Sequence, residues 1–569
     1  MNAKYDFAPW LRASLRTGVD VYTEREIWRN SIGACGGWNK KGYYEEQRKG
    51  GYSVNNDIII SADKKFGDFS IDGFVGTSLY FYQDDVLNGK TSNGITIPGY
   101  YSLKASVDPA KVYSTIKKKQ VNSLYGKVSG SWKSTLFLDI TARNDWSSTL
   151  PVETRSYFYP SISGSLVISE LFNMPQWFDF WKIRASWTQT KSDLGVYETD
   201  RSYSISTNLW DNMNGATYPT TMRSTLVEPS ATRTYEIGTG MHFLKNRLQV
   251  DIAYYNKLYY NLTKKAAISD ACGFEYTLIN TNEEHVRKGV EVTVSANIIQ
   301  SKDWDWITTF NWSLDRYYYS KIDPIYSTQK DWVKPGERWD WLGYYDWERD
   351  PYGNIIHDNG YPIQSKYQSV AGYENPDWIF GFNNTVRYKD FTLSFTLDGR
   401  IGGVAHSVMD QALWMTGAHR DSDTFWRYDE VVNGNKSYIG EGVKVVSGSV
   451  EYDSQGHIVS DTRVFDLNDK AVSYEGYMKL YNGAGNVWNA KHQHILKQTF
   501  IKLRELSLNY NIPQNICNKI GMKRASIAFV GNNLFLLTKD FKFSDPDKAT
   551  ENLNSPSLRM LGCNIKINF

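Results

Sequence analysis

The last nine residues, 561–569, read LGCNIKINF. Apolar side chains occupy the odd positions, polar side chains or glycine occupy the even ones, and the run ends on an aromatic residue. This period of two predicts a β-strand with one apolar and one polar face. A soluble domain seldom ends on a bare apolar strand, because a free edge invites aggregation, whereas the last strand of a transmembrane β-barrel places one face against lipid. We therefore expect an all-β transmembrane barrel, with Ile565, Ile567 and Phe569 as its C-terminal assembly signal.

The composition agrees with a barrel and excludes several other classes. Among 569 residues, 64 Lys and Arg balance 62 Asp and Glu, so no charge excess indicates a nucleic-acid partner. The mean hydropathy is −0.50, and no uninterrupted apolar stretch reaches the roughly 20 residues of a membrane helix. A barrel tolerates this hydropathy because half of each strand faces a polar lumen. The four cysteines show no CxxC or zinc spacing, and Cys563 is interpreted as a small apolar residue of the last strand.

The same alternation recurs along the whole chain, for example at Val290–Ile298, Phe391–Leu397 and Leu506–Tyr510. We count about 16 strand candidates by this test. Their approximate spans are 8–23, 54–65, 67–84, 120–132, 133–145, 157–170, 180–191, 231–244, 246–261, 286–300, 303–318, 376–389, 390–402, 498–511, 523–537 and 557–569.

The connections between these candidates alternate in length. Tight polar turns near residues 66–68, 245–247, 301–303 and 389–390 alternate with the long segments 85–119, 192–230, 262–285, 319–375 and 403–497. This layout is typical of an up-and-down antiparallel outer-membrane barrel with short periplasmic turns and long extracellular loops. It predicts that the first strand runs outward and that the last strand leaves Phe569 on the periplasmic side. A propeller would need repeated blades, and no such repeat is present in the sequence.

Three stretches resemble the SusC/RagA family of TonB-dependent outer-membrane transporters of the Bacteroidetes. The first runs from Asn375-Pro376-Asp377-Trp378 through Gly381-Phe382-Asn383-Asn384 to Asp398-Gly399-Arg400; the second is FIKLRELSLNY at 500–510, followed by Ile512-Pro513; the third is VGNNLF at 530–535, followed by Asp545-Pro546-Asp547. Together these motifs are specific, and the resemblance covers nearly all of residues 1–569, which we treat as a single barrel unit.

The resemblance implies a barrel of about 22 strands that works with a SusD-like surface lipoprotein to import oligosaccharides or peptides. Members of the family also carry a signal peptide, a TonB-contacting segment and a plug, and none of these is recognisable here, so contact with TonB would go through a region that precedes the barrel. Roughly six strands would be missing at the N-terminal side. The sheet would then either close as a smaller pore or leave two open edges in lipid.

Aromatic residues in the long loops are candidates for a solute platform, because flat rings stack on apolar faces of sugars. The alternative is packing within the loops or against a plug, and the sequence favours packing. The candidates are Trp332, Trp339, Trp341, Trp414 and Trp426, with Trp347 and Trp488 in the same loops.

No cofactor, metal or catalytic group is predicted. His492 and His494 could share a strand face, but no further ligand completes a metal site. The loop from Asp350 to Asn354 resembles a calcium loop only distantly, because Pro351 and Tyr352 interrupt its acidic ladder, and a solvated turn is favoured. Neither Asn144-Asp145 nor Asp398-Gly399-Arg400 has a partner acid, and motifs such as GxSxG or HExxH are lacking.

The sequence thus predicts a non-enzymatic outer-membrane transporter part for a glycan or peptide, located in the outer membrane if an export signal precedes it. Without plug and TonB segment, this stretch alone is not expected to transport actively. A passive pore, a surface glycan-binding scaffold or a non-functional remnant are the alternatives, and a soluble glycoside hydrolase is the least favoured because the acid pair is missing.

Overall fold

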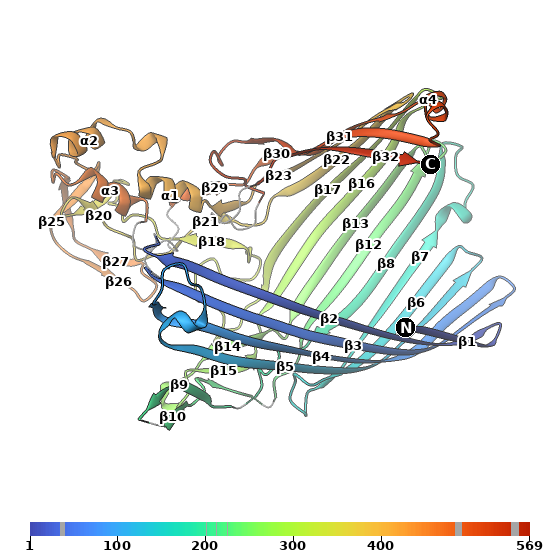
Figure 1. Cartoon of the computed structure of the whole chain (residues 1–569), viewed down its shortest axis with the longest axis horizontal. Helices are drawn as coiled ribbons and strands as arrows, with labels where there is room; N and C mark the ends of the chain where they lie inside the picture. The colour runs from blue at the N-terminus through green and yellow to red at the C-terminus, as the bar shows by residue number, and fades with distance from the viewer. Residues whose placement is uncertain (35–39, 201, 212, 225, 484–491, 548–556) are drawn as a thin grey trace.

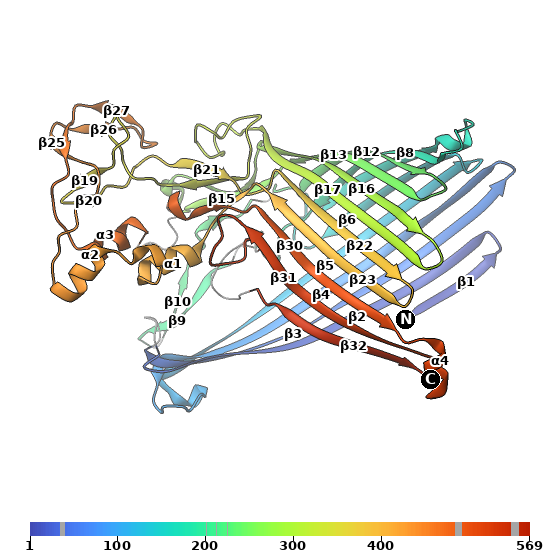
Figure 2. The ribbon, with the colours of Figure 1, turned by 90° about the horizontal axis from the view of Figure 1, so that it is seen from above.

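The computed structural model describes residues 1–569 except 35–39, 201, 212, 225, 484–491 and 548–556. Most of the chain forms one antiparallel sheet of 17 strands, each paired with the next, which curves into a wall (Figures 1 and 2). The wall strands are β1 (Asn2–Ala8), β2 (Leu11–Ile32), β3 (Lys41–Phe66), β4 (Phe69–Ile95), β5 (Ser106–Trp132), β6 (Leu136–Ser147), β7 (Ser156–Val167), β8 (Phe178–Ser192), β12 (Ser230–Phe243), β13 (Leu248–Tyr260), β16 (Glu284–Gln300), β17 (Trp304–Lys321), β22 (Trp378–Tyr388), β23 (Phe391–Ile401), β30 (Phe500–Asn511), β31 (Arg524–Thr538) and β32 (Met560–Asn568).

The predicted all-β antiparallel architecture is confirmed, and each of the 16 predicted strands overlaps a strand of the wall. One strand was missed, so the count of about 16 is wrong by one. Strand β1 pairs with β2 from Asn2 opposite Arg16 to Ala8 opposite Leu11. The sequence signal was weak there because β1 is only seven residues long and begins directly after the first residue.

Three strands are much longer than predicted. Segment 85–119 was expected to be a loop, but β4 continues to Ile95 and β5 begins at Ser106. About 9–11 residues span the hydrocarbon core, so strands of 26 or 27 residues must project well beyond it. Figure 1 shows β2 to β5 reaching far toward the loop end of the wall. Charged pairs such as Lys49 with Glu26, 2.7 Å apart, line this projection, and a search for apolar alternation does not detect strands of this kind.

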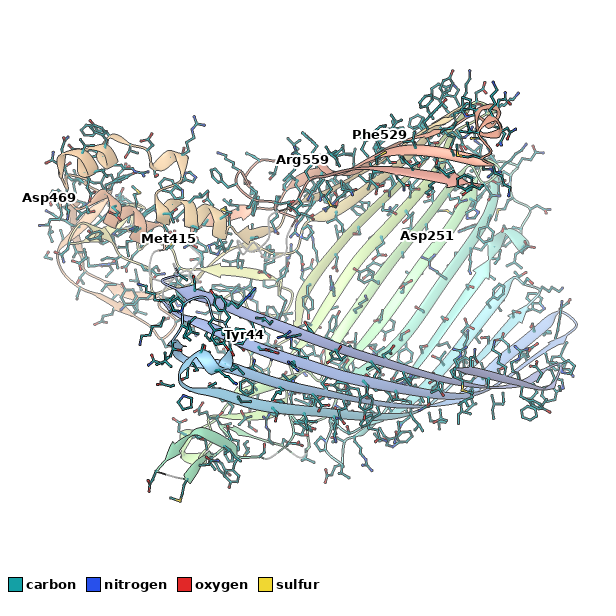
Figure 3. The ribbon with its side chains drawn as sticks, viewed as in Figure 1. Tyr44, Asp251, Met415, Asp469, Phe529 and Arg559 are labelled. Atoms are coloured by element: carbon teal, nitrogen blue, oxygen red, sulfur yellow. The ribbon has the colours of Figure 1, made fainter. Side chains whose placement is uncertain are left out.

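The two faces of the wall differ in chemistry. Large apolar side chains stand exposed on one face, including Ile237, Phe529 and Ile565. On the other face Arg184 of β8 forms a bidentate pair with Asp251 of β13, at 2.7 and 2.8 Å. Figure 3 labels Asp251 and Phe529 on their strands. This division is the one that lipid on the outside and a wet lumen on the inside require.

The sheet has two outer strands, β1 and β32, which do not pair with each other in the part of the chain that the structure describes. All nine residues of β32 are exposed. In lipid, an unpaired backbone group costs several kcal/mol, so edges of this kind need strand partners inside a membrane. The sequence allowed either a smaller closed pore or a sheet with two open edges, and the structure is the sheet with open edges.

The C-terminus lies at the turn end of the wall, the N-terminus lies part-way along the wall where β1 begins, and the large loops lie at the end opposite the turns (Figure 1). At the turn end, the β30–β31 connection contains α4 (Gln514–Lys519) and the β7–β8 connection contains η2 (Ile168–Glu170). Strand β32 runs toward this end and β2, the first strand that the sequence predicted, runs away from it, as the connection lengths predicted, whereas the missed strand β1 runs toward the turn end. Among the described residues, no helix has both the length and the apolar character needed to cross a membrane.

The loop end carries smaller elements of its own. Those before residue 300 are η1 (Leu103–Ala105), β9 (Ser204–Trp210), β10 (Met213–Thr217), β11 (Thr221–Met222), β14 (Thr263–Ala267), η3 (Asp270–Cys272) and β15 (Tyr276–Asn280). Residues 322–377 and 402–499, which we call the loop module, contain β18 (Trp341–Tyr344), β19 (Ile356–Asp358), β20 (Tyr361–Pro362), β21 (Ser369–Tyr373), β24 (Val404–His406), α1 (Val408–Thr416), η4 (Arg420–Ser422), α2 (Phe425–Tyr428), η5 (Asp429–Asn433), β25 (Val443–Ser447), β26 (Val450–Tyr452), β27 (Ile458–Asp461), β28 (Val464–Leu467), α3 (Tyr474–Tyr481), η6 (His492–His494) and β29 (Ile495–Lys497).

Candidate functional site

The loop module joins two long loops into one folded body at the mouth of the wall (Figures 1 and 2). Strand β19 of the first loop pairs in parallel with β25 of the second, with Ile356 opposite Val443. Ile356 is fully buried. Gly442 permits this close approach, because its φ is +144° and a Cβ there would lie 2.2 Å from the carbonyl oxygen of Ile355. The two loops therefore share a core and are not independent flaps.

A buried ion pair also joins the two loops. Arg463 contacts Glu348, and both side chains are almost completely buried. Arg463 is further held by Asp461, 2.7 Å away, and Tyr452 donates its hydroxyl to Glu348 at 2.8 Å. Hydrogen bonds to Asp461 and Glu348 raise the pKa of Arg463. This pair fixes the β26–β27 hairpin and β28 against the first loop.

A second link between the loops is polar and exposed. The two ring nitrogens of His457 lie 2.8 Å from Asp453 and 2.8 Å from Asp331, so the ring bridges the second loop and the first. Tyr367 donates its hydroxyl to Asp331 at 3.1 Å and packs against the His457 ring at 4.4 Å. Hydrogen bonds to Asp453 and Asp331 raise the pKa of His457. We call these four residues the histidine clasp.

Helix α3 places three tyrosines on one side, because residues 474, 477 and 481 follow the 3-4 spacing of a helical face. Tyr477 and Tyr481 stack with ring centroids 5.9 Å apart, and Tyr481 stacks in turn on Trp347 at 5.4 Å. His357 extends the column on the other side of Tyr477 at 5.9 Å. Burial raises the pKa of Tyr477 and of Tyr481, so both hydroxyl groups stay neutral at physiological pH.

A cavity of about 490 Å³ lies beside this column. Helix α1 contributes Asp410 and Trp414, which are four residues apart and so lie on one helical face. Ser407 begins this helix by accepting a hydrogen bond from the backbone N–H of Asp410 at 3.2 Å. The remaining charged and aromatic lining residues are Arg349, Tyr438, Glu441, Tyr477, Tyr481 and His494. A second cavity of about 810 Å³ shares Trp414 and Met478 with the first.

The predicted loop tryptophans do not form one platform. Trp332 and Trp341 contact each other at 5.3 Å within the first loop. Trp339 lies against Tyr317 of the wall at 4.7 Å and is 41% exposed. Trp426, 39% exposed, sits on α2.

Of the predicted tryptophans, Trp414 lines the cavities, and its indole stacks on His419 at 4.4 Å. Trp347 is buried in the core of the loop module, and Trp488 lies outside the described residues. A solute-binding role for Trp332, Trp339, Trp341, Trp414 and Trp426 stays a prediction, as does the assembly role of Ile565, Ile567 and Phe569.

The weaker sequence candidates have structural roles. His492 and His494 belong to η6 and not to a strand, and His494 is fully buried against Asp410. The Asp350 carboxylate accepts hydrogen bonds from the backbone N–H groups of Tyr352 and Asn354 at 2.9 and 2.8 Å. The carboxylate therefore stabilises a local turn. Asp145 is buried between Arg143 and Tyr159. Among the described residues, no group of three His, Cys, Asp or Glu side chains could hold a metal ion.

Sequence reasoning missed the cavity and both links between the loops. Glu348 and Arg463 are 115 residues apart, and Asp410 and His494 are 84 residues apart. No local period or spacing connects such pairs. The one available signal was the pair of unusually long, aromatic-rich connections, which indicated that these two loops fold on themselves.

These features define a class of protein, an outer-membrane β-barrel wall whose outer end carries folded loops. No protein-family model matches the chain. It is 20% identical over 539 residues to TonB-dependent receptor P3 of Formosa agariphila, covering 88% of this chain and 49% of that protein. It is 24% identical over 544 residues to TonB-dependent receptor P26 of the same organism, with 87% and 49% coverage.

A solved structure of the RagAB peptide transporter superposes on the whole chain with a TM-score of 0.74, 14% identity and 61% of its own chain covered. Of the two TonB-dependent receptors, P3 and P26, the chain spans about half the length. The resemblance to SusC/RagA-type TonB-dependent receptors and the outer-membrane location are confirmed.

Proposed function

We propose that this chain forms the greater part of the barrel wall, with its loop module, of a TonB-dependent outer-membrane importer for a glycan or peptide. The observation that supports this most is the superposition of the entire chain on the RagAB peptide transporter, loops included. The mechanism is physical: the wall and loops hold the solute, and no residue of the chain performs covalent chemistry.

The open edges support a role as part of a larger barrel. Among the described residues, strand β2 has no strand partner along residues 18–32 on the side where β1 pairs with Leu11 to Arg16. Further antiparallel strands between β1 and β32 would satisfy these groups, and about five would bring the 17 present to the 22 that the resemblance implies. The same edges weigh against a passive pore formed by this sheet alone.

The lumen chemistry also supports passage of a polar solute. Arg504 and Lys502 of β30 extend toward acidic residues of the β31–β32 connection, where Lys502 lies 2.5 Å from Asp545. The network therefore lines the interior near the loop end. We further propose that a SusD-like surface lipoprotein covers the loop module, that TonB acts through a region outside this chain, and that the loop tryptophans Trp332, Trp339, Trp341, Trp414 and Trp426 help to hold the solute.

Uptake by living cells tests the proposal. The gene that encodes this chain is deleted, and uptake of fluorescently labelled oligosaccharide and peptide mixtures is compared with that of the parent and of a complemented strain. We expect lower uptake of one class of solute, restored by the complete gene and abolished when TonB is removed. Unchanged uptake in the deletion strain, or restored uptake that does not need TonB, would overturn the proposal.

A further inference from the structure

His494 lines the 490 Å³ cavity and carries one polar atom that has no partner among the described residues. Its side chain is fully buried and lines the cavity, and its Nδ1 lies 2.7 Å from the Asp410 carboxylate. In the described part of the chain, Nε2 has no hydrogen-bond partner. Because Nδ1 faces the Asp410 carboxylate, we assign the ring proton to Nδ1, and in that tautomer Nε2 is an acceptor. Buried acceptors are normally satisfied, so this atom points to a ligand that supplies a donor.

Several other polar groups of the cavity are already engaged with neighbouring residues. The amide nitrogens of Asn482 and Gln493 already donate to backbone carbonyls at 2.7 and 2.6 Å. The guanidinium of Arg349 donates to the carbonyl of Gly353 at 2.9 Å, and its charge lies 3.6 Å from Asp346. The one cation of the lining is therefore engaged by neighbours.

Acceptors and negative charge remain available. Glu441 is exposed at the rim and makes no ion pair or hydrogen bond among the described residues. His357 donates Nδ1–H to the carbonyl of Ile355 at 3.1 Å, so its Nε2 accepts from the Tyr477 hydroxyl at 3.0 Å. The Tyr477 oxygen is thereby left as an acceptor. Two carboxylates line the cavity: Glu441, and Asp410, which is already held by His494 and lies 3.4 Å from Nε2 of His419.

We propose that this cavity binds a primary ammonium group carried by the solute, an inference that rests on the proposed importer function. An ammonium group brings three donors and no acceptor, which matches His494 Nε2, the Tyr477 oxygen and the carboxylates. A neutral polyol also donates hydroxyl hydrogens to these acceptors, but it brings no positive charge to the carboxylates.

Two sources carry this chemistry, an amino sugar and a lysine-containing peptide, and binding experiments distinguish them. The full-length protein, purified in detergent, is titrated by calorimetry with glucosamine disaccharide and with trilysine. Their fully N-acetylated forms, which lack the ammonium groups, serve as control probes. We expect at least one amine to bind and its acetylated form to bind about tenfold or more weakly, the range of a charged hydrogen bond. Binding of the disaccharide alone or of trilysine alone identifies the source.

Variants test the site itself. Glu441→Gln should weaken amine binding about fivefold, the upper range for an exposed charge pair, whereas Glu451→Gln, at the exposed position of β26, should leave amine binding unchanged. His494→Phe should also weaken binding, with protease resistance of the loop module as the check on folding. Equal binding of acetylated probes, no binding of either amine, or unaltered binding in both Glu441→Gln and His494→Phe would overturn the proposal. Calorimetry needs no TonB, so amine binding without uptake refutes only the importer function, and uptake without amine binding refutes only the site.

Discussion

Arg504 of β30 donates its Nε to both carboxylate oxygens of Asp398 on β23, each at 2.8 Å. The same guanidinium also contacts Asp547 in the β31–β32 connection, with a second donor bond of 2.6 Å. These three residues belong to the three separate motifs that carry the family resemblance. One arginine therefore holds two wall strands and a loop together inside the barrel.

Replacing Arg504 should loosen this junction. Arg504→Ala leaves two carboxylates without their partner, and we expect a loss of about 1.5–3 kcal/mol, as for hydrogen bonds to charged groups. Arg504→Lys should recover only part of the loss, because an ammonium cannot make the bidentate contact. The temperature at which the folded barrel converts to the unfolded form on electrophoresis measures the effect.

A matched control comes from the turn end, where Lys519→Ala changes an exposed residue of α4. It should shift stability by no more than about 0.5 kcal/mol. An Arg504→Ala barrel as resistant to heat as the Lys519→Ala barrel would contradict the role given to the junction.

The wall could be predicted from the sequence largely because one physical rule governs every strand. A strand between lipid and water must alternate, and the alternation at Val290–Ile298 or Leu561–Phe569 is visible without any tertiary information. The projecting halves of β3 to β5 escaped the same test, since both of their faces are wet and Lys49 can pair with Glu26 instead of alternating with apolar residues.

The candidate site could be predicted only as a pair of loops rich in aromatic residues. The cavity depends on which residues of the first loop meet which residues of the second, as in the pairing of β19 with β25. Such a register is set by mutual packing and leaves no period in the sequence. Trp414 and Trp426 looked equivalent as aromatic loop residues, yet only Trp414 lines the cavities.

Removing the charge of Glu348 should unfold part of the loop module without affecting the wall. Glu348→Gln leaves Arg463 with Asp461 as a carboxylate partner, so we expect a cost below the roughly 3–5 kcal/mol of a buried pair that is fully broken. We expect faster amide exchange and proteolysis within residues 450–461, with unchanged heat resistance of the barrel. Glu451→Gln in the same hairpin is exposed and should behave as the parent does. Equal exchange in the two variants would show that the ion pair does not hold the hairpin.

The histidine clasp should open as the pH rises. The pKa of His457 is higher in the folded protein than the ordinary value of 6.5. The protonated ring therefore stabilises the clasp fully below pH 6.5, and this stabilisation is lost as the pH rises through the pKa of the folded protein. Hydrogen bonds from His457, and secondly from Tyr367, lower the pKa of Asp331 below its ordinary value of 3.8. The ionised carboxylate therefore stabilises the clasp fully above pH 3.8, and this stabilisation is lost as the pH falls further. The clasp is therefore strongest between about pH 4 and pH 6.5.

Spin labels at positions 330 and 455, on the two sides of the clasp, can follow this opening. We expect a narrow distance distribution at pH 5.5 and a broader one at pH 9. His457→Ala should give the broad distribution at both values, whereas His242→Ala, at the turn end of β12, should keep the pH response of the parent. A distribution that stays narrow at pH 9 would mean that the packing of Tyr367 on the ring, and not charge, holds the loops.

Gly442→Ala should separate the two loops at the pairing of β19 with β25. The new Cβ would lie 2.2 Å from the Ile355 carbonyl oxygen, so the strands must move apart in addition to the strain of a positive φ. Gly336→Ala provides the matched control, because Gly336 has a φ of +91° but no atom within 4 Å of the added carbon. Backbone strain alone costs on the order of 1–3 kcal/mol, so the difference in stability between the two variants measures the cost of the close approach between the new Cβ and the Ile355 carbonyl oxygen.

We expect protease cleavage within 356–358 and 443–447 for Gly442→Ala at enzyme concentrations that leave Gly336→Ala intact. Similar cleavage of both variants would mean that the two loops do not depend on this strand pair for their shared core.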